Sequence, residues 1–138
     1  MTKSRPHSGS CLCGQIKFEA DEFTPQSAHC HCSMCRKFHG AAFSTFGEVR
    51  LSSFRWLNGT ELLSTYIAKN GTVRQFCSIC GSSLTFQSAR HIDSIEVALA
   101  TLDTKLDIQP DAHIHVASKV SWLNLNDDLP AHIGDRNK

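Results

Sequence analysis

Long apolar runs are missing from this chain of 138 residues. No stretch approaches the roughly 20 consecutive apolar residues that a membrane-spanning helix requires. The first ten residues, MTKSRPHSGS, also lack the apolar core of a signal peptide. We therefore expect a cytoplasmic protein that does not take a membrane as its partner.

An excess of charge of either sign is missing too. The 14 lysines and arginines nearly balance the 13 aspartates and glutamates, which leaves a formal net charge of +1. Domains that bind DNA or RNA usually show a basic surplus, so this balance argues against a nucleic-acid partner. Hydrophobic residues make up 41% and charged residues 20%, which is the ordinary globular range and argues against disorder.

Sustained helical periodicity is the third absence. No window keeps an apolar repeat of 3.6 residues over three turns, and the best short candidate, of one or two turns, follows Met34. Period-two alternation is common instead, as in GQIKFEA, where Ile16 and Phe18 alternate with polar neighbours. Similar mixtures recur in AFSTFGEVRL, ELLSTYIA, TVRQF, SSLTFQS and SIEVALATL. The sequence predicts a mainly β, mostly antiparallel protein with one domain over residues 1–138, ending in a solvated tail, GDRNK.

Cysteine is abundant, by contrast, and its number is odd. The seven cysteines fall into three motifs: CLCG at residues 11–14, CHCSMC at 30–35 and CSICG at 77–81. An odd count suits a disulfide framework poorly, and clustered cysteines in a reducing cytosol more often bind metal or perform thiol chemistry. The motifs therefore predict metal sites.

The first and last motifs together supply four ligands. In a strand, residues two apart face the same side, so Cys11 and Cys13 can both face one ion, while Cys77 and Cys80 have the spacing of a zinc knuckle. A closed structural zinc commonly takes two such pairs from separate segments. We expect a structural zinc on these four cysteines. Incidental buried cysteines, another metal or a redox pair are the alternatives.

The middle motif supplies only three thiols, which come from Cys30, Cys32 and Cys35. Three protein ligands with an open fourth position are typical of a catalytic zinc. Neighbouring histidines could instead close the site. His29 and His31 would point away from Cys30 and Cys32 in an extended segment, whereas a helical turn could bring His39 round. A metal-free thiol cluster is the third alternative.

The order of CLCG, CHCSMC, FCSICGSSL, HIHVASKVSW and LPAH resembles the glutathione-dependent formaldehyde-activating enzyme family, also called the GFA or CENP-V family. The resemblance runs from about Gly9 to His132 and includes all seven cysteines, with Gly14 and Gly81 after the outer pairs. It implies an Mss4-like fold of folded antiparallel β-sheets with zinc knuckles and one or two short helices. It also implies two zinc ions, one structural on Cys11, Cys13, Cys77 and Cys80, and one catalytic on Cys30, Cys32 and Cys35.

The same resemblance implies a carbon–sulfur lyase that joins glutathione to formaldehyde as S-hydroxymethylglutathione. Zinc would bind the thiol as a thiolate, the nucleophilic form, and the aldehyde oxygen would then need a proton. Candidate proton donors are His29, His31, His39, His113 and His115. Candidate partners for the glutathione carboxylates are Arg36, Lys37 and Lys119, for each of which a solvated surface charge is the alternative. Trp122 and Phe38 are interpreted as pocket walls or as core residues.

Two other functional classes remain open at this stage. One is a non-catalytic zinc module that binds a protein or a nucleic acid, and the near-neutral charge argues against the nucleic acid. The other is a thiol or metal sensor in which Cys30, Cys32 and Cys35 are reversibly oxidised with release of the metal.

Overall fold

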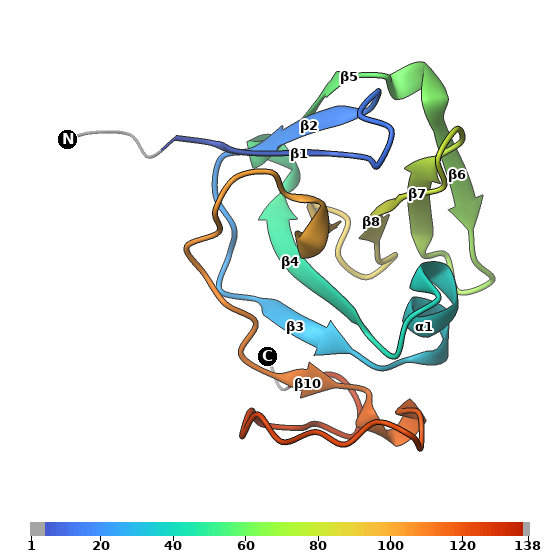
Figure 1. Ribbon diagram of the computed structural model, residues 1–138, viewed down its shortest axis with the longest axis vertical. Helices are drawn as coiled ribbons and strands as arrows, with labels where there is room; N and C mark the ends of the chain where they lie inside the picture. The colour runs from blue at the N-terminus through green and yellow to red at the C-terminus, as the bar shows by residue number, and fades with distance from the viewer. Residues whose placement is uncertain (1–4, 137–138) are drawn as a thin grey trace.

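The computed structural model describes residues 5–136, and this part of the chain is mainly β with one α-helix (Figure 1). Its strands are β1 (His7–Ser10), β2 (Lys17–Ala20), β3 (Ser27–Cys30), β4 (Ser44–Arg50), β5 (Phe54–Asn58), β6 (Leu63–Ile67), β7 (Val73–Cys77), β8 (Ser83–Gln87), β9 (Ser94–Ala98) and β10 (His113–Ile114). The helix α1 spans Ser33–His39, and short 3₁₀ turns lie at Leu51–Ser53, Thr60–Leu62, Leu99–Thr101 and Val116–Ser118. Within residues 5–136, no helix has the length and apolarity needed to cross a bilayer.

The strands form two sheets. The smaller sheet has the order β1-β2-β5, and the larger has the order β10-β3-β4-β9-β8-β7-β6. All strand pairs are antiparallel except β10 with β3, which run parallel. The last part of the chain therefore adds β10 as an edge strand beside β3, which carries Cys30, as Figure 1 shows in orange beside blue.

The main core lies between the two sheets. Phe18 and Ile16 from the small sheet and its preceding loop are fully buried, and they join a cluster with Ile95 and Val97 of β9. The neighbouring residues Ser94 and Glu96 line a cavity on the other side of the large sheet. Because side chains alternate along a strand, the large sheet uses one face for the core and the other for the cavity.

The helix α1 is short because both of its ends are fixed by local interactions. Cys32 is its N-cap, and the Cys32 Sγ accepts a hydrogen bond of 3.3 Å from the backbone N–H of Cys35. Gly40 ends the helix in the left-handed conformation with φ of 59°, and its N–H donates to the carbonyl of Arg36. The C-x-x-C spacing thus coincides with the first helical turn, which turns both thiols toward one another.

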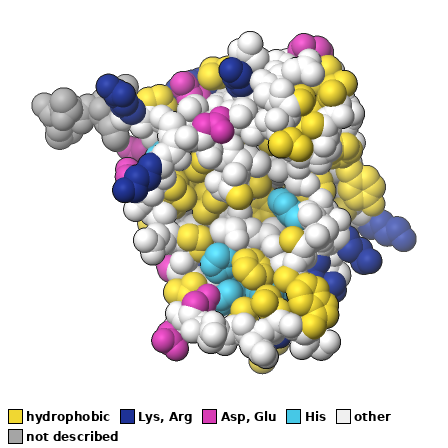
Figure 2. All heavy atoms as spheres, viewed as in Figure 1, with side chains coloured by type: hydrophobic (Ala, Val, Ile, Leu, Met, Phe, Trp, Pro, Cys, Tyr) yellow, Lys and Arg dark blue, Asp and Glu magenta, His cyan; other side chains and the backbone are white. Residues whose placement is uncertain are grey.

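Hydrogen bonds through two buried histidines and the exposed Asp127 attach the C-terminal segment to the end of β3. The Asp127 carboxylate can only accept, so His113 Nε2–H donates to it over 2.8 Å. His113 Nδ1 then accepts from His31 Nε2–H, also over 2.8 Å, and both histidine side chains are almost fully buried. In Figure 2 the histidine side chains gather over the region where β3 and β10 lie. These hydrogen bonds fix the position of β10 and of the residues that follow it.

The expected mainly β architecture and the short helix are confirmed. All six predicted strand segments overlap observed strands, and the helix starts at Ser33. Four strands were not predicted: β1, β3, β5 and the two-residue β10. The expectation of a solvated tail at GDRNK agrees with the exposure of Gly134 and Asp135 but is wrong for Arg136, whose Nη2 donates to the Ser27 carbonyl over 2.7 Å and pairs with Asp111. Residues 137–138 of that tail lie outside the described part.

Substitution of Gly9 should destabilise the fold, because Gly9 faces Phe18 across the β1–β2 pair. A Cβ on residue 9 would lie 2.2 Å from Phe18 Cζ, and Phe18 is fully buried and has no free space to move into. We expect Gly9→Ala to lower the free energy of unfolding by about 1–3 kcal/mol, the usual cost of overpacking. Gly134→Ala is the matched control, since a Cβ there meets nothing within 4 Å. Equal thermal midpoints for the two variants would contradict the packing argument.

Acid should destabilise the fold before the carboxylates titrate. Burial lowers the pKa of His31 and of His39 to about 4, and the charges of His113 and Arg74 act in the same direction. The unfolded chain therefore takes up more protons between pH 6.5 and 4, so stability is full above 6.5 and falls as the pH drops toward 4. Urea titrations across this range should show a shallower fall for His39→Leu than for the wild type. If the free energy of unfolding falls equally with pH in His39→Leu and in the wild type, His39 is not a buried neutral histidine.

Candidate functional site

The cysteines of the first and last motifs converge although they are more than 60 residues apart. All four sulfur atoms, from Cys11, Cys13, Cys77 and Cys80, lie within 4.8 Å of one another. The Cys11 and Cys13 sulfurs are 3.5 Å apart, and those of Cys13 and Cys77 are 3.9 Å apart, with a separation of 64 positions in sequence. Sulfur ligands at about 2.3 Å from a tetrahedral zinc stand about 3.8 Å apart, so the four thiols fit such an ion.

Backbone N–H groups surround these sulfurs. Ile16 N donates to Cys11 Sγ over 3.3 Å, and Ile79 N and Cys80 N donate to Cys77 Sγ over 3.4 and 3.5 Å. The Ser82 hydroxyl is the largest cause that lowers the pKa of Cys80 to about 5. Gly81 has a φ of 80°, which a residue with a Cβ rarely adopts, and its N–H closes the turn onto the Cys77 carbonyl. These donors favour thiolates, the form that binds metal.

The three cysteines of the middle motif also converge. The sulfurs of Cys30, Cys32 and Cys35 lie within 4.8 Å of one another, and we call these residues the cysteine trio. Hydrogen bonds from the thiols of Cys30 and Cys35, followed by the Cys35 backbone N–H, lower the pKa of Cys32 to about 2. The contacts of Cys30 with the Cys32 and Cys35 thiols, together with burial, raise the pKa of Cys30. Cys32 is therefore the member of the trio that most readily exists as a thiolate. Its place at the N-terminus of α1 also favours a negative charge.

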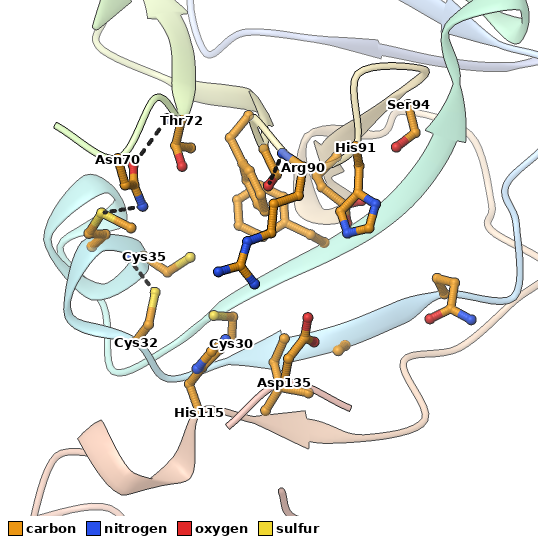
Figure 3. A pocket seen from close by; sticks show the side chains of 18 of the residues that line it. Cys30, Cys32, Cys35, Asn70, Thr72, Arg90, His91, Ser94, His115 and Asp135 are labelled. Atoms are coloured by element: carbon orange, nitrogen blue, oxygen red, sulfur yellow. Dashed lines mark hydrogen bonds between the residues drawn. The ribbon is translucent and has the colours of Figure 1, made fainter. Parts of the chain in front are cut away.

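The trio borders a cavity of about 450 Å³ on one face of the large sheet. Figure 3 shows the three sulfurs at one end of this space, with the Arg90 guanidinium extending toward them from the loop between β8 and β9. His91 comes from the same loop, while His115 and Asp135 approach from the C-terminal segment. The cavity is thus enclosed by parts of the chain that are far apart in sequence.

Of the five histidines that were candidate proton donors, His115 lines the cavity and the other four do not. His115 lines the cavity, and its charge contributes to the lowered pKa of Cys32. It adopts φ of 57° and ψ of 39°, an uncommon backbone conformation for a residue with a Cβ. The remaining four candidates, His29, His31, His39 and His113, do not line this cavity.

The histidines also do not close the trio. Within residues 5–136, no histidine or carboxylate has a ligand atom close enough to join the three sulfurs as a fourth member of the group. His39 packs edge-on against Phe46 and Phe38 instead, with ring centroids 5.2 Å apart in each pair. The alternative of a closed Cys₃His site through His39 is therefore not supported by the geometry.

A third group of side chains that could bind a metal consists of His29, His113 and Asp127. Their ligand atoms lie within 4.8 Å of one another. Asp127 is already joined to His113 over 2.8 Å, and His29 Nδ1 is 2.8 Å from the Thr45 hydroxyl. The pKa of Asp127 is lowered mainly by the hydrogen bond from His113. The existing hydrogen bonds account for this group as a structural link between β3, β4 and the C-terminal segment.

The cations expected to bind glutathione carboxylates lie elsewhere. Arg36, Lys37 and Lys119 do not line the cavity, and Lys119 Nζ donates instead to the carbonyls of Val120 and Leu123. The cationic side chains in the cavity are those of Arg74, Arg90 and Arg136. Sequence reasoning missed them because Arg74 lies in a predicted strand and Arg90 and Arg136 lie in segments without a motif.

The two aromatic residues proposed as pocket walls also differ from expectation. Trp122 is 72% exposed, so it is neither a cavity wall nor a core residue. Phe38 is partly buried beside Arg74, and its ring centroid lies 5.0 Å from the Arg74 guanidinium carbon. The aromatic side chains that line the cavity are Phe46 and Phe86, whose rings meet edge to face at 4.5 Å.

Comparison with known proteins agrees with this arrangement. A protein of Halomonas elongata named "Putative glutathione-dependent formaldehyde-activating enzyme" is 27% identical over 124 residues, which cover 85% of this chain and 79% of that protein. An uncharacterized lyase of Schizosaccharomyces pombe is 30% identical over 80 residues, covering 58% of this chain and 56% of the relative. A crystal structure of a Rhodobacter sphaeroides protein matches 72% of this chain and 91% of that one, with a TM-score of 0.63 and 27% identity.

The family profile described as glutathione-dependent formaldehyde-activating enzyme matches residues 6–118. This range contains all three cysteine motifs and the cavity-lining residues up to His115. On this match, which covers most of the sequence, the chain belongs to the glutathione-dependent formaldehyde-activating enzyme family.

Proposed function

We propose that the protein is a zinc-dependent carbon–sulfur lyase that catalyses the reversible addition of glutathione to formaldehyde. The product of addition is S-(hydroxymethyl)glutathione. Family membership supports the reaction class, and the names of the relatives from Halomonas elongata and Schizosaccharomyces pombe agree with it. In this proposal, Cys11, Cys13, Cys77 and Cys80 hold a structural zinc, while Cys30, Cys32 and Cys35 hold the catalytic one.

The observation that carries the proposal is the open side of the cysteine trio. Three sulfurs stand within 4.8 Å of one another at the end of a cavity of about 450 Å³, and no further ligand of residues 5–136 joins them. The other four cysteines form a complete ligand set among backbone N–H donors. A zinc module used only for structure or for binding a macromolecule has no need of an incomplete set facing a cavity.

Zinc at the trio would lower the pKa of an incoming thiol and favour its thiolate form. The chain's own residues must then orient the rest of the ligand. Arg90 extends into the cavity, and within residues 5–136 no carboxylate forms a salt bridge with it. Arginine binds carboxylates through paired N–H donors, so Arg90 is suited to a carboxylate of glutathione.

The addition step balances without any further reagent. The thiolate sulfur bonds to the aldehyde carbon, and the electrons of the C=O π bond move to the oxygen. The proton that the thiol lost ends on that oxygen, and the reverse reaction returns it. We assign the proton transfer to His115, because it lines the cavity beside the trio and its backbone is held in an uncommon conformation.

The two cysteine groups should respond differently to substitution. Cys32→Ser should leave a folded protein with one zinc and no activity, because the trio lies outside the main core cluster. Cys77→Ser should lose cooperative folding, because metal affinity at a structural site contributes directly to folding free energy. Native mass spectrometry and thermal denaturation measure both effects, and the wild type should carry two zinc ions. A molten Cys32→Ser or an unchanged thermal midpoint in Cys77→Ser would reverse the assignment.

The reaction itself is tested by the rate at which formaldehyde exchanges between its free and glutathione-bound forms, followed by NMR with ¹³C-labelled formaldehyde. The wild type should accelerate this exchange in both directions. His115→Asn keeps a residue that tolerates the left-handed backbone and should slow the exchange by about 10²–10⁴-fold, as loss of a general acid does. His91→Asn is the control from the opposite side of the cavity. A larger loss in the control would give His91 the proton transfer, and no acceleration by the wild type would end the proposal.

A further inference from the structure

We infer that Arg74 is the counter-charge of the cysteine trio, and that its buried guanidinium makes the cavity select ligands that present a thiolate. Arg74 is thus a positioning and specificity-determining residue. The inference deepens the proposed function, because the selected ligand is the thiol of that reaction, but its first consequence is metal affinity and does not depend on turnover.

The burial of Arg74 is the starting observation. Arg74 lies in β7 and is only 4% exposed, although it lines the cavity. Its Nη2 lies 3.7 Å from the Cys35 sulfur, within hydrogen-bond range for a sulfur acceptor. Its Nη1 is buried without a hydrogen-bond partner, and within residues 5–136 no carboxylate forms a salt bridge with Arg74. A buried charge is normally paired. The trio supplies the negative charge in direct contact through the Cys35 sulfur, while the Glu96 carboxylate, from the cross-strand partner of Phe86, lines the same cavity.

Two aromatic rings hold the guanidinium at that point. Its central carbon lies 5.0 Å from the centroid of Phe38 in α1 and 5.0 Å from that of Phe86 in β8. Arg74 and Phe86 are direct cross-strand partners, so the β7–β8 register itself places the ring against the guanidinium. Rings at this distance attract a cation and also exclude water from it. The charge is therefore fixed in position and weakly screened.

The charge balance at the trio explains what this cation does. Three thiolates outweigh a divalent ion by one negative charge, and a thiolate ligand adds another. Each added negative charge meets growing repulsion, which a cation in contact with Cys35 offsets. A thioether of the same size brings no charge and gains nothing from Arg74.

Arg74 and Arg90 both line the cavity, but they lie at different places and should contact different parts of a ligand. Arg74 contacts the trio, whereas Arg90 comes from the loop between β8 and β9 and extends toward the sulfurs from across the cavity. Loss of Arg74 should therefore weaken metal and thiolate together. Loss of Arg90 should weaken any ligand that carries a carboxylate, whatever stands at its sulfur.

The test compares Arg74→Met, which keeps an apolar side chain between the two rings, with Arg74→Lys, which keeps the charge. Zinc affinity at the weaker site is measured by chelator competition on the full chain. Binding of glutathione and of S-methylglutathione is measured by calorimetry on the zinc-loaded protein. We expect Arg74→Met to weaken zinc and glutathione by about tenfold or more each, as loss of a charge-assisted hydrogen bond does, and to spare S-methylglutathione. Arg74→Lys should recover most of both losses.

Arg90→Met is the matched control and should weaken both peptides equally with unchanged zinc affinity. The inference is overturned if Arg74→Met leaves both the zinc affinity and the preference for thiol over thioether as in the wild type. If Arg74→Met does not fold, Arg74→Gln replaces it as the neutral variant under the same criteria. A wild type that binds neither peptide refutes the proposed function, and the chelator competition then decides the role of Arg74 by itself.

Discussion

One sheet has to satisfy two environments, and the rest of the structure follows from this constraint. The seven-stranded sheet presents Ile95 and Val97 to a dry core shared with the smaller sheet. The alternate residues Ser94 and Glu96 line the cavity. A strand that serves both sides cannot shift its register by one position without placing apolar groups in the cavity and polar groups in the core. The side of the cavity formed by Ser94 and Glu96 is therefore as firmly specified as the core itself.

The two groups of cysteines show how surroundings, more than residue type, set the chemistry available. The first group has four thiols, backbone N–H donors at 3.3 to 3.5 Å and tight glycine turns. The second has three thiols, a helix start, a buried arginine and an adjoining cavity. A complete ligand set among many donors is inert and holds the chain together. An incomplete set beside a compensated charge is suited to exchange one ligand for another.

Much of this could be predicted from local sequence pattern. Strand alternation around Ile16 and Phe18, the short helix after Met34 and the convergence of distant cysteine pairs all leave local signals, and all were found in the structure. The cavity leaves no such signal, because it arises from long-range pairing of strands. Arg74 looks like a polar residue of an ordinary strand, and its role appears only when β7, β8 and α1 are brought together.

Errors at the C-terminal segment have the same origin. β10 has two residues, too few for a periodic pattern, and its attachment depends on a hydrogen-bond chain through His113 and Asp127. The exposed Trp122 was misjudged because large aromatics are usually buried, whereas Arg136, in an apparent tail, reaches back to Ser27 across 109 positions. A residue type predicts only its average burial. The actual burial of Trp122 and Arg136 depends on tertiary contacts that the local sequence does not show.

The cavity wall contributed by the C-terminal segment has a consequence for the order of assembly. Contacts such as His31 with His113 span 82 positions, and Arg136 with Ser27 spans more, so they close late in folding. The trio is local in sequence and can gather its sulfurs on the helix start much earlier. During that interval the thiols stand uncovered by His115 and Asp135. A chain in which β10 has not yet docked lacks His115 and Asp135 beside the trio, so its three sulfurs are more accessible to oxidants than in the folded protein.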